Sequence, residues 1–201
     1  RARGAGGAKA SRWEPLPEGF GELNAFAEAG AIGDAHRVLR RIEHDVPQRL
    51  KRMLFNTAIK ACAHAGELQV AELYFQAMVR QRVTPSGRSF GKMIHSAVRA
   101  NDTAAADRWF QQMEGAGISP SATTCGLMAR AEAAKGSVEA AEGWLRRAME
   151  MGELSEAAVA IVATKLLEQG DSERARGWFD QALLWTGKRS DSDSSSSSSP
   201  S

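Results

Sequence analysis

Basic side chains recur at a fixed interval along the middle of the chain. Four of them, which we call the basic column, are separated by 35 residues each time: Lys60, His95, Arg130 and Lys165. Asn56 lies four residues before Lys60, so the two side chains share one face of a helix. His64 and Arg99 extend this stripe by one helical turn. Cations with such a spacing can hold the phosphates of an extended single strand, which gives affinity without sequence information.

The basic column is equally compatible with a solvated helix face that happens to be basic. Glu132 and Glu168 lie close in sequence to Arg130 and Lys165 and oppose their charge. From the residues alone, both the phosphate-binding and the solvated-face interpretation stay open.

The chain lacks the sequence motifs of common catalytic sites. It has no Gly-rich phosphate loop, no GxSxG motif and no HxE with a CxxC pair. None of its four histidines has a spacing typical of metal ligands. Glu139 and Glu142 are expected to be solvated charges on a helix rather than an acid–base pair. We therefore expect no enzyme, no metal or cofactor and no small-molecule substrate.

The spacing of the basic column equals the period of an internal sequence repeat of about 35 residues. Every copy places an alanine five residues after a glycine or asparagine, and a large apolar residue four positions later. The alanines are Ala35, Ala71, Ala106, Ala141 and Ala175. The large apolar residues are Leu39, Phe75, Phe110, Leu145 and Phe179. Four columns in phase, these two among them, indicate a repeat protein.

Each copy is predicted to form a hairpin of two helices. In the clearest copy, apolar residues at spacings of three and four predict a first helix near 53–64 and a second near 68–81, with Gly66 ending the first. The small alanine allows the two antiparallel helices to approach closely. Because one hairpin cannot bury its own apolar face, successive hairpins must stack, and the sequence predicts an all-α fold, an α-solenoid.

Tryptophans recur at one position of the second helix: Trp109, Trp144 and Trp178. Their neighbours are core positions, so we expect these rings to fill the joints between hairpins. The alternative is a row of aromatic rings on which nucleic-acid bases stack.

Composition and charge limit the remaining classes. The 201 residues are 43% hydrophobic and 25% charged, which is typical of a globular protein. No apolar run approaches the ~18 residues of a membrane span, so we expect no membrane insertion. Cys62 and Cys125 are predicted to be buried thiols rather than parts of a disulfide framework. Residues 14–201 hold 22 basic against 24 acidic residues, so a polyanion would need a local basic stripe.

The two ends differ from the repeats. Residues 1–15 form a basic leader whose composition is typical either of the end of an organelle transit peptide or of a flexible segment with no targeting role. Residues 188–201 are rich in serine and are expected to be disordered. Between them, over 16–187, five repeats are predicted at 16–51, 52–86, 87–121, 122–155 and 156–187.

The copy from Met53 to Ser86 resembles a pentatricopeptide repeat. Its marks are FNT at the start of the first helix, AG at its end, A..LYF.AM in the second helix and V.PS at the close. The next copies keep the pattern in DRWFQQMEGAGISPS and AEGWLRRAMEMG. The resemblance implies a right-handed superhelix that binds single-stranded RNA along its concave face, one nucleotide per repeat.

The resemblance also implies which residues contact RNA. Family members select a base with a polar residue early in the first helix and with the last residue of the repeat, here Asn56 and Ser86, while Met53 would flank the base. Three corresponding positions carry no polar side chain: Gly91, Gly126 and Ala160. At most one repeat therefore has a usable base-reading pair. The expected RNA-binding residues are Met53, Asn56, Lys60, Ser86, His95, Arg99, Arg130 and Lys165.

Two functions follow from these observations, and both stay open. The first is a single-stranded RNA-binding adaptor with weak sequence specificity, which acts on an organellar transcript in RNA processing, stability or translation. The second is a protein–protein interaction scaffold of an organellar assembly, which uses the groove or an exposed end of the solenoid. The resemblance places either function in the chloroplast or the mitochondrion.

Overall fold

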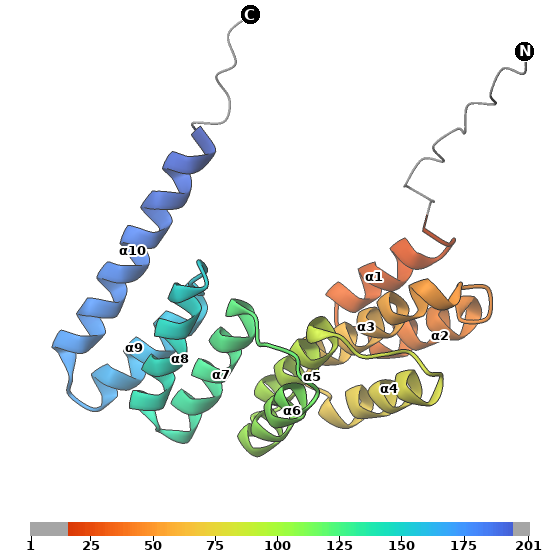
Figure 1. Ribbon diagram of the computed structural model, residues 1–201, viewed down its shortest axis with the longest axis horizontal. Helices are drawn as coiled ribbons and strands as arrows, with labels where there is room; N and C mark the ends of the chain where they lie inside the picture. Colours follow the sequence, from red (N-terminus) through yellow and green to blue (C-terminus); the bar gives the residue numbers. More distant parts are fainter. Residues whose placement is uncertain (1–15, 195–201) are drawn as a thin grey trace, which may run out of the picture.

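The computed structural model describes residues 16–194, and every regular element in this range is an α-helix (Figure 1). The helices pair into five antiparallel hairpins that stack along the chain, which confirms the predicted all-α solenoid. They are α1 (Phe20–Glu28), α2 (Ile32–Ile42), α3 (Gln48–Ala65), α4 (Leu68–Arg80), α5 (Gly87–Arg99), α6 (Thr103–Gly115), α7 (Ala122–Lys135), α8 (Val138–Glu150), α9 (Glu156–Glu168) and α10 (Ser172–Ser194).

Glycine and alanine shape each hairpin as the sequence predicts. Gly66 follows α3 in the left-handed region with φ of 77°, which glycine adopts at little cost, and the chain then turns into α4. The repeated alanines of the second helices are all buried, with at most 1% of their surface exposed. Their small side chains allow the paired helices to pack closely.

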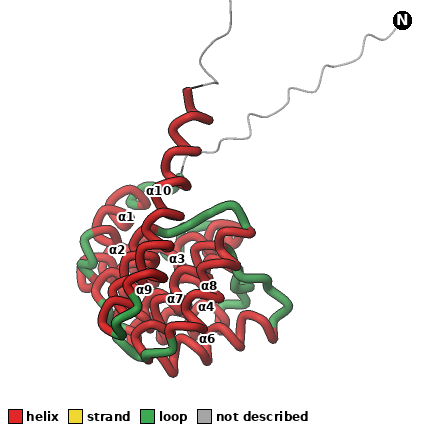
Figure 2. The backbone as a smooth tube through the Cα atoms, turned by 90° about the vertical axis from the view of Figure 1, so that its left-hand side faces the viewer, coloured by secondary structure: helices red, strands yellow, loops and turns green. Residues whose placement is uncertain are grey.

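The hairpins stack through their first helices. In order, α1, α3, α5, α7 and α9 each contact the next, while α2, α4, α6 and α8 each contact the first helix that follows. The first helices therefore share one face of the solenoid, and the second helices form its other layer. Viewed from the side of the carboxyl-terminal hairpin, α10 projects beyond the stack (Figure 2).

Aromatic side chains fill the joints between hairpins. The Trp109 ring lies edge-on to Phe75 of the preceding hairpin, with centroids 4.7 Å apart. Trp144 meets Phe110 in the same way at 4.9 Å. Trp109 is buried and Trp144 is partly buried, so the tryptophans are joint residues, as expected, and do not form a surface on which bases stack.

The hydrophobic core divides at α7. One large cluster extends from Phe20 to Ala131 and includes Met128 of α7. A second cluster begins at Ala129 and Ala133 of the same helix and extends through α8, α9 and α10. Helix α7 therefore contributes adjacent faces to both parts of the core.

The helical part of the described chain extends further at its carboxyl end than the sequence predicts. The basic leader, residues 1–15, lies outside the described residues. Helix α10 continues to Ser194, seven residues beyond the predicted repeat boundary at 187, because each residue added to a formed helix gains one backbone hydrogen bond. The remainder of the serine-rich segment, 195–201, is outside the description. No helix within 16–194 has the length and hydropathy needed to cross a membrane.

Candidate nucleic-acid interface

A groove of about 1310 Å³ runs along the first helices. Its walls come from α1, α3, α5 and α7 and from the turns that precede α5, α7 and α9. Five of the eight predicted RNA-binding residues line it: Met53, Asn56, Lys60, Ser86 and His95. The structure therefore brings together the residues that the sequence placed in the second repeat and extends the surface into its neighbours.

Asn56 and Ser86 occupy this groove in different states. The side-chain oxygen of Asn56 is buried and has no hydrogen-bond partner among the described residues. Ser86 is the N-cap of α5, and its backbone N–H donates to the Ser89 hydroxyl at 3.0 Å. Asn56 thus has a buried acceptor without a partner among the described residues, whereas Ser86 is part of the N-terminal cap of α5.

The serine that closes the second, third and fourth repeats caps the following helix in each case. Ser121 and Ser155 begin α7 and α9, and their hydroxyls accept hydrogen bonds from the backbone N–H of Thr124 and Ala158. Serine at this position satisfies a backbone donor that the helix leaves free. The recurrence of serine in this column is therefore explained by helix capping without any contact to a base.

Lys60 is neutralised by α1. Its ammonium group forms an ion pair with Glu28 and donates to the Asn24 side-chain oxygen at 3.3 Å. The hydrogen bond from Lys60 lowers the pKa of Glu28, so this carboxylate stays charged beside it. The sequence suggested Glu132 and Glu168 as opposing acids, but the acid that meets Lys60 comes from another repeat.

Three cations around His95 have no carboxylate partner within the described residues, and one of them, Lys92, lines the groove. They are Lys92, Arg99 and Arg130. Arg99 donates to the backbone oxygen of His64 at 3.2 Å, and the Arg130 Nε atom is buried without a hydrogen-bond partner. Burial, followed by the charge of Arg99, lowers the pKa of Arg130. This part of the solenoid therefore concentrates positive charge that the described residues do not balance.

His95 lies among these cations and is neutral at pH 7. Burial first, and then the charges of Arg130, His64, Arg99 and Lys92, lower its pKa to about 4. Its ring meets His64 edge-on with centroids 6.1 Å apart. His95 thus belongs to the basic column by position, although it carries no charge there at neutral pH without an anion.

Lys165 does not continue the column. The N-caps Ser86 and Ser121 are 35 residues apart, but Ser155 follows after 34, so the position equivalent to Arg130 is Thr164. One residue turns a helix by about 100°. Lys165 is accordingly displaced from the column and pairs with Glu168 at 2.7 Å. Like Arg99 and Arg130, it does not line the groove. The constant interval of 35 in the sequence concealed the one-residue shortening of this repeat.

Sequence reasoning missed Lys92 as a groove residue. Lys92 lines the groove together with Arg88, one turn earlier on α5. Burial first, and then the charges of Lys60 and Arg88, against a smaller opposing effect of Glu28, lower the pKa of Lys92. The spacing of four between Arg88 and Lys92 was the available signal, because it places both side chains on one helix face.

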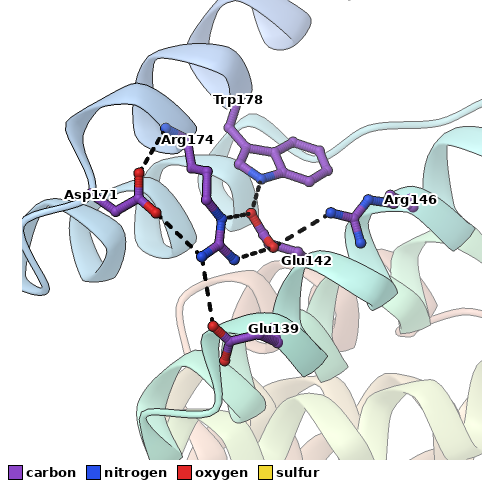
Figure 3. Close-up of polar contacts among 6 residues, drawn as sticks. All are labelled: Glu139, Glu142, Arg146, Asp171, Arg174 and Trp178. Carbon is purple, nitrogen blue, oxygen red and sulfur yellow. Dashed lines mark hydrogen bonds and ion pairs between the residues drawn. The ribbon is translucent and has the colours of Figure 1, made fainter.

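A second charged cluster lies at the other end of the solenoid and is fully paired (Figure 3). Glu142 of α8 is 4% exposed, which corrects the expectation of a solvated charge. It accepts hydrogen bonds from Arg174 at 2.6 Å and from Trp178 at 2.9 Å. Burial opposes ionisation of Glu142, but these bonds outweigh it and hold its pKa below the ordinary value.

This cluster closes the joint between the last two hairpins. Arg174 also pairs with Asp171 at 3.3 Å and with Glu139 at 3.6 Å, and Arg146 reaches Glu142 from the following turn of α8. Trp178 thus has a polar partner for its indole N–H, which Trp109 and Trp144 lack among the described residues. Every charge in this cluster has a partner, so we interpret the cluster as a structural contact between two hairpins and not as a ligand site.

The thiols and acids offer no metal site. Within residues 16–194, no three side chains of His, Cys, Asp or Glu gather in a way that could hold a metal ion. Cys62 and Cys125 are buried free thiols, as predicted, and burial raises the pKa of Cys62 to about 12.

Comparisons with known proteins agree with this architecture. The family model of the pentatricopeptide (PPR) repeat matches residues 53–83 and 88–118. The PPR domain of Arabidopsis thaliana protein-only RNase P 1, solved with tRNA, is 19% identical with a TM-score of 0.60, over 80% of this chain and 85% of that one. PPR10 with an 18-nucleotide psaJ RNA element is 17% identical with a TM-score of 0.62, over 86% of this chain and 25% of that one.

A third structure widens the range of similar proteins. The nuclear proteinaceous RNase P 2 of A. thaliana is 14% identical with a TM-score of 0.58, over 84% of this chain and 38% of that one. The chain thus spans about a quarter of PPR10 and well under half of this nuclease. No curated protein sequence matches the chain. Two units of the chain therefore match the pentatricopeptide repeat, and the described residues have a solenoid fold similar to that of solved PPR proteins.

Proposed function

We propose that the chain binds single-stranded RNA in the groove of α1, α3, α5 and α7, chiefly through the phosphates. The observation that carries this proposal is the group formed by Lys92, Arg99 and Arg130, for which the described residues supply no carboxylate partner. A phosphate backbone supplies the missing negative charge at regular intervals. The solved complexes of the protein-only RNase P 1 domain with tRNA and of PPR10 with RNA support this choice of ligand.

Base recognition in this groove is weak and confined to one repeat. Asn56 offers an unpaired acceptor, and Met53 lies beside it with 37% of its surface exposed. At the equivalent positions Gly91 and Gly126 present no side chain at all. Hydrogen bonds to base edges carry sequence information, so an interface with one such residue binds many sequences with similar affinity.

We further propose that the chain acts as a non-catalytic adaptor in organellar RNA processing, stability or translation. The basic composition of residues 1–13 supports delivery to the chloroplast or the mitochondrion. A fusion of the complete chain to a fluorescent protein, expressed with and without residues 1–15, tests this proposal. Loss of organellar fluorescence on removal of the segment is expected, while nuclear fluorescence in both cases would contradict it.

Fluorescence anisotropy with labelled single-stranded RNA tests the binding proposal. Three to four phosphate contacts predict a slope of about −2 to −3 for the logarithm of the association constant against the logarithm of salt concentration, at about 0.7 per contact. Homopolymers are expected to differ in affinity by less than about tenfold. No binding at 50 mM salt and tens of micromolar protein would overturn the proposal.

Charge reversal distinguishes RNA binding at the groove from non-specific attraction to the overall charge of the chain. The Lys92→Glu, Arg130→Glu double variant is expected to bind RNA at least about tenfold more weakly and to lose about 1.4 from the salt slope. The matched control is Arg80→Glu, Arg108→Glu, which makes the same charge change on the exposed faces of α4 and α6. Equal losses in both double variants would show non-specific attraction instead of a groove.

A further inference from the structure

The last hairpin exposes a surface that every other hairpin buries. At the large apolar position of the second helix, Leu39, Phe75, Phe110 and Leu145 are at most 7% exposed. Phe179 occupies the same position of α10 and is 42% exposed. The difference follows from the stacking, because each of the first four second helices contacts the first helix of the next hairpin.

The internal joints show what covers this surface. Helix α5 contacts both α3 and α4, and the Phe90 ring of α5 lies 5.3 Å from the Phe75 ring of α4. Helix α7 contacts α5 and α6 in the same manner, and α9 contacts α7 and α8. In each case an amphipathic helix lies across both helices of the hairpin before it.

A cavity marks the corresponding place on the last hairpin. It has a volume of about 370 Å³ and lies between α9 and α10, with Val159, Ala160, Phe179, Ala182 and Leu183 as apolar walls. Glu156, in the first turn of α9, is its charged lining residue. No cation lines this cavity, so its chemistry differs from that of the RNA groove.

We propose that the α9–α10 end is a docking site for an amphipathic α-helix of a partner protein. The partner helix lies across α9 and α10 as α5 lies across α3 and α4, and it places an aromatic or large aliphatic side chain against Phe179. A basic residue near that anchor meets Glu156. The proposal is independent of RNA binding, which uses α1 to α7.

A second copy of the chain does not offer such a helix. The apolar face of α1 is already used in the core, where Phe20, Leu23 and Ala27 are buried and Phe26 is partly buried. In the described residues before α3, Leu16 is the exposed large apolar side chain, and it precedes α1. A head-to-tail contact would therefore place a largely polar surface on Phe179, so we assign the site to a different protein.

A peptide that copies the helix of an internal joint tests the site. The probe is a fluorescent peptide of residues 86–100, which includes α5, held helical by a hydrocarbon staple that replaces Arg88 and Lys92. We expect it to bind the complete chain with a dissociation constant of about 10–100 µM, as is usual for one short helix. A peptide with Phe90→Asp is expected to show no binding.

Two matched variants of the chain locate the peptide. Ala160 and Ala157 are both exposed on α9, and Ala160 lines the cavity whereas Ala157 does not. Ala160→Arg fills the cavity and is expected to weaken peptide binding at least about tenfold, whereas Ala157→Arg leaves it unchanged. Arginine is a good helix former, so neither variant should unfold, and circular dichroism verifies this.

Three results would overturn the proposal. They are no peptide binding to the wild-type chain at 1 mM peptide concentration, equal binding to the two arginine variants, and self-association of the chain in sedimentation that Ala160→Arg abolishes. RNA anisotropy on Ala160→Arg keeps the two sites distinct. Retained RNA binding with lost peptide binding is the expected combination, while failure of RNA binding in the wild type would overturn the proposed function and leave the peptide result valid.

Discussion

The two charged regions of the solenoid, the RNA groove and the Glu142 cluster, are built from similar residues and differ in how their charges are paired. Around Glu142, two arginines and an indole N–H surround one buried carboxylate. At the groove, Lys92, Arg99 and Arg130 lie around His95 without a carboxylate partner among the described residues, and Glu28 forms an ion pair with Lys60. A paired buried charge fixes a joint, whereas unpaired cations at a surface attract an anion.

This difference gives a way to distinguish structural from functional charges in a repeat protein. Both Glu142 and Lys92 lie on helices at positions that the sequence alone presents as ordinary solvated charges. The partners of Glu142 come from α10, 32 and 36 residues away, whereas Lys92 has no carboxylate partner among the described residues. The distinction therefore depends on how the repeats stack.

The largest effect is expected from Glu142→Ala. Removal of the carboxylate leaves the buried Trp178 N–H without its acceptor and Arg174 with fewer partners, which costs about 2–4 kcal/mol of unfolding free energy. Urea denaturation measures this change. The control is Glu139→Ala, since Glu139 is 76% exposed and its loss should cost less than about 0.5 kcal/mol. Unaltered RNA affinity in Glu142→Ala would show that this cluster acts on stability alone, and a stability equal to wild type would contradict its role in the joint.

Acid should destabilise the two regions in different pH windows. The folded chain lowers the pKa of His95 from 6.5 to about 4, so it binds fewer protons than the unfolded chain between these values. Unfolding free energy therefore falls as the pH drops from about 6.5 to about 4. Glu142 has a lowered pKa, and its contribution is lost only below its ordinary 4.5.

Denaturant unfolding at several pH values tests this order. His95→Gln should flatten the curve between pH 6.5 and 4.5 and leave the steeper loss below pH 4.5 in place. An unchanged curve in this variant would show that His95 titrates normally.

A polar side chain at Gly91 should strengthen base recognition by a smaller amount. A Cβ atom at Gly91 would lie 3.5 Å from the Thr124 hydroxyl, an ordinary contact, so Gly91→Asn can repeat the role of Asn56 one repeat later. We expect about threefold tighter RNA binding and a larger spread among homopolymers. At Gly126 the Cβ would lie 3.3 Å from Ser155, so Gly126→Asn disturbs the start of α9 and should cost about 1 kcal/mol of stability without tighter binding.

The smallest change is expected from Glu28→Gln. This variant removes the acid that neutralises Lys60 and leaves the groove with one more available cation. Anisotropy should show about twofold tighter RNA binding and a steeper salt dependence, because exposed ion pairs are weak and easily replaced. Weaker binding would mean that Glu28 positions Lys60 for the phosphate.

Most of the fold could be predicted from the sequence because the same residue pattern recurs in each repeat. Gly66, Ala71 and Phe75 each have counterparts at the same interval, and the period, the hairpin and the stack follow from them. The exposure of Phe179 could not be read in the same way, because it depends on the absence of a further helix in the described stack. The extension of α10 to Ser194 was also missed, since serine and aspartate lower helix propensity without forbidding a helix.

The site was only partly predictable because the partners and neighbours of its charged residues come from other repeats. Asn56 and Arg130 were found from their positions, and the structure leaves an atom of each buried and unpaired. Lys165 was placed in the column by a constant interval, although the repeat before it is one residue shorter. The neutral state of His95 requires knowledge of which cations surround it, and they come from neighbouring helices.

The division of the core at α7 has a consequence for how the molecule opens. Two hydrophobic clusters that share one helix behave as two cooperative units coupled through nearest neighbours. The carboxyl-terminal hairpin can therefore unfold and refold while α3 to α6 stay intact. In native-state hydrogen exchange, amides of α9 and α10 would exchange through openings of lower free energy than those of α3 and α5. A partner that docks on α10 would protect amides there without slowing exchange in the groove.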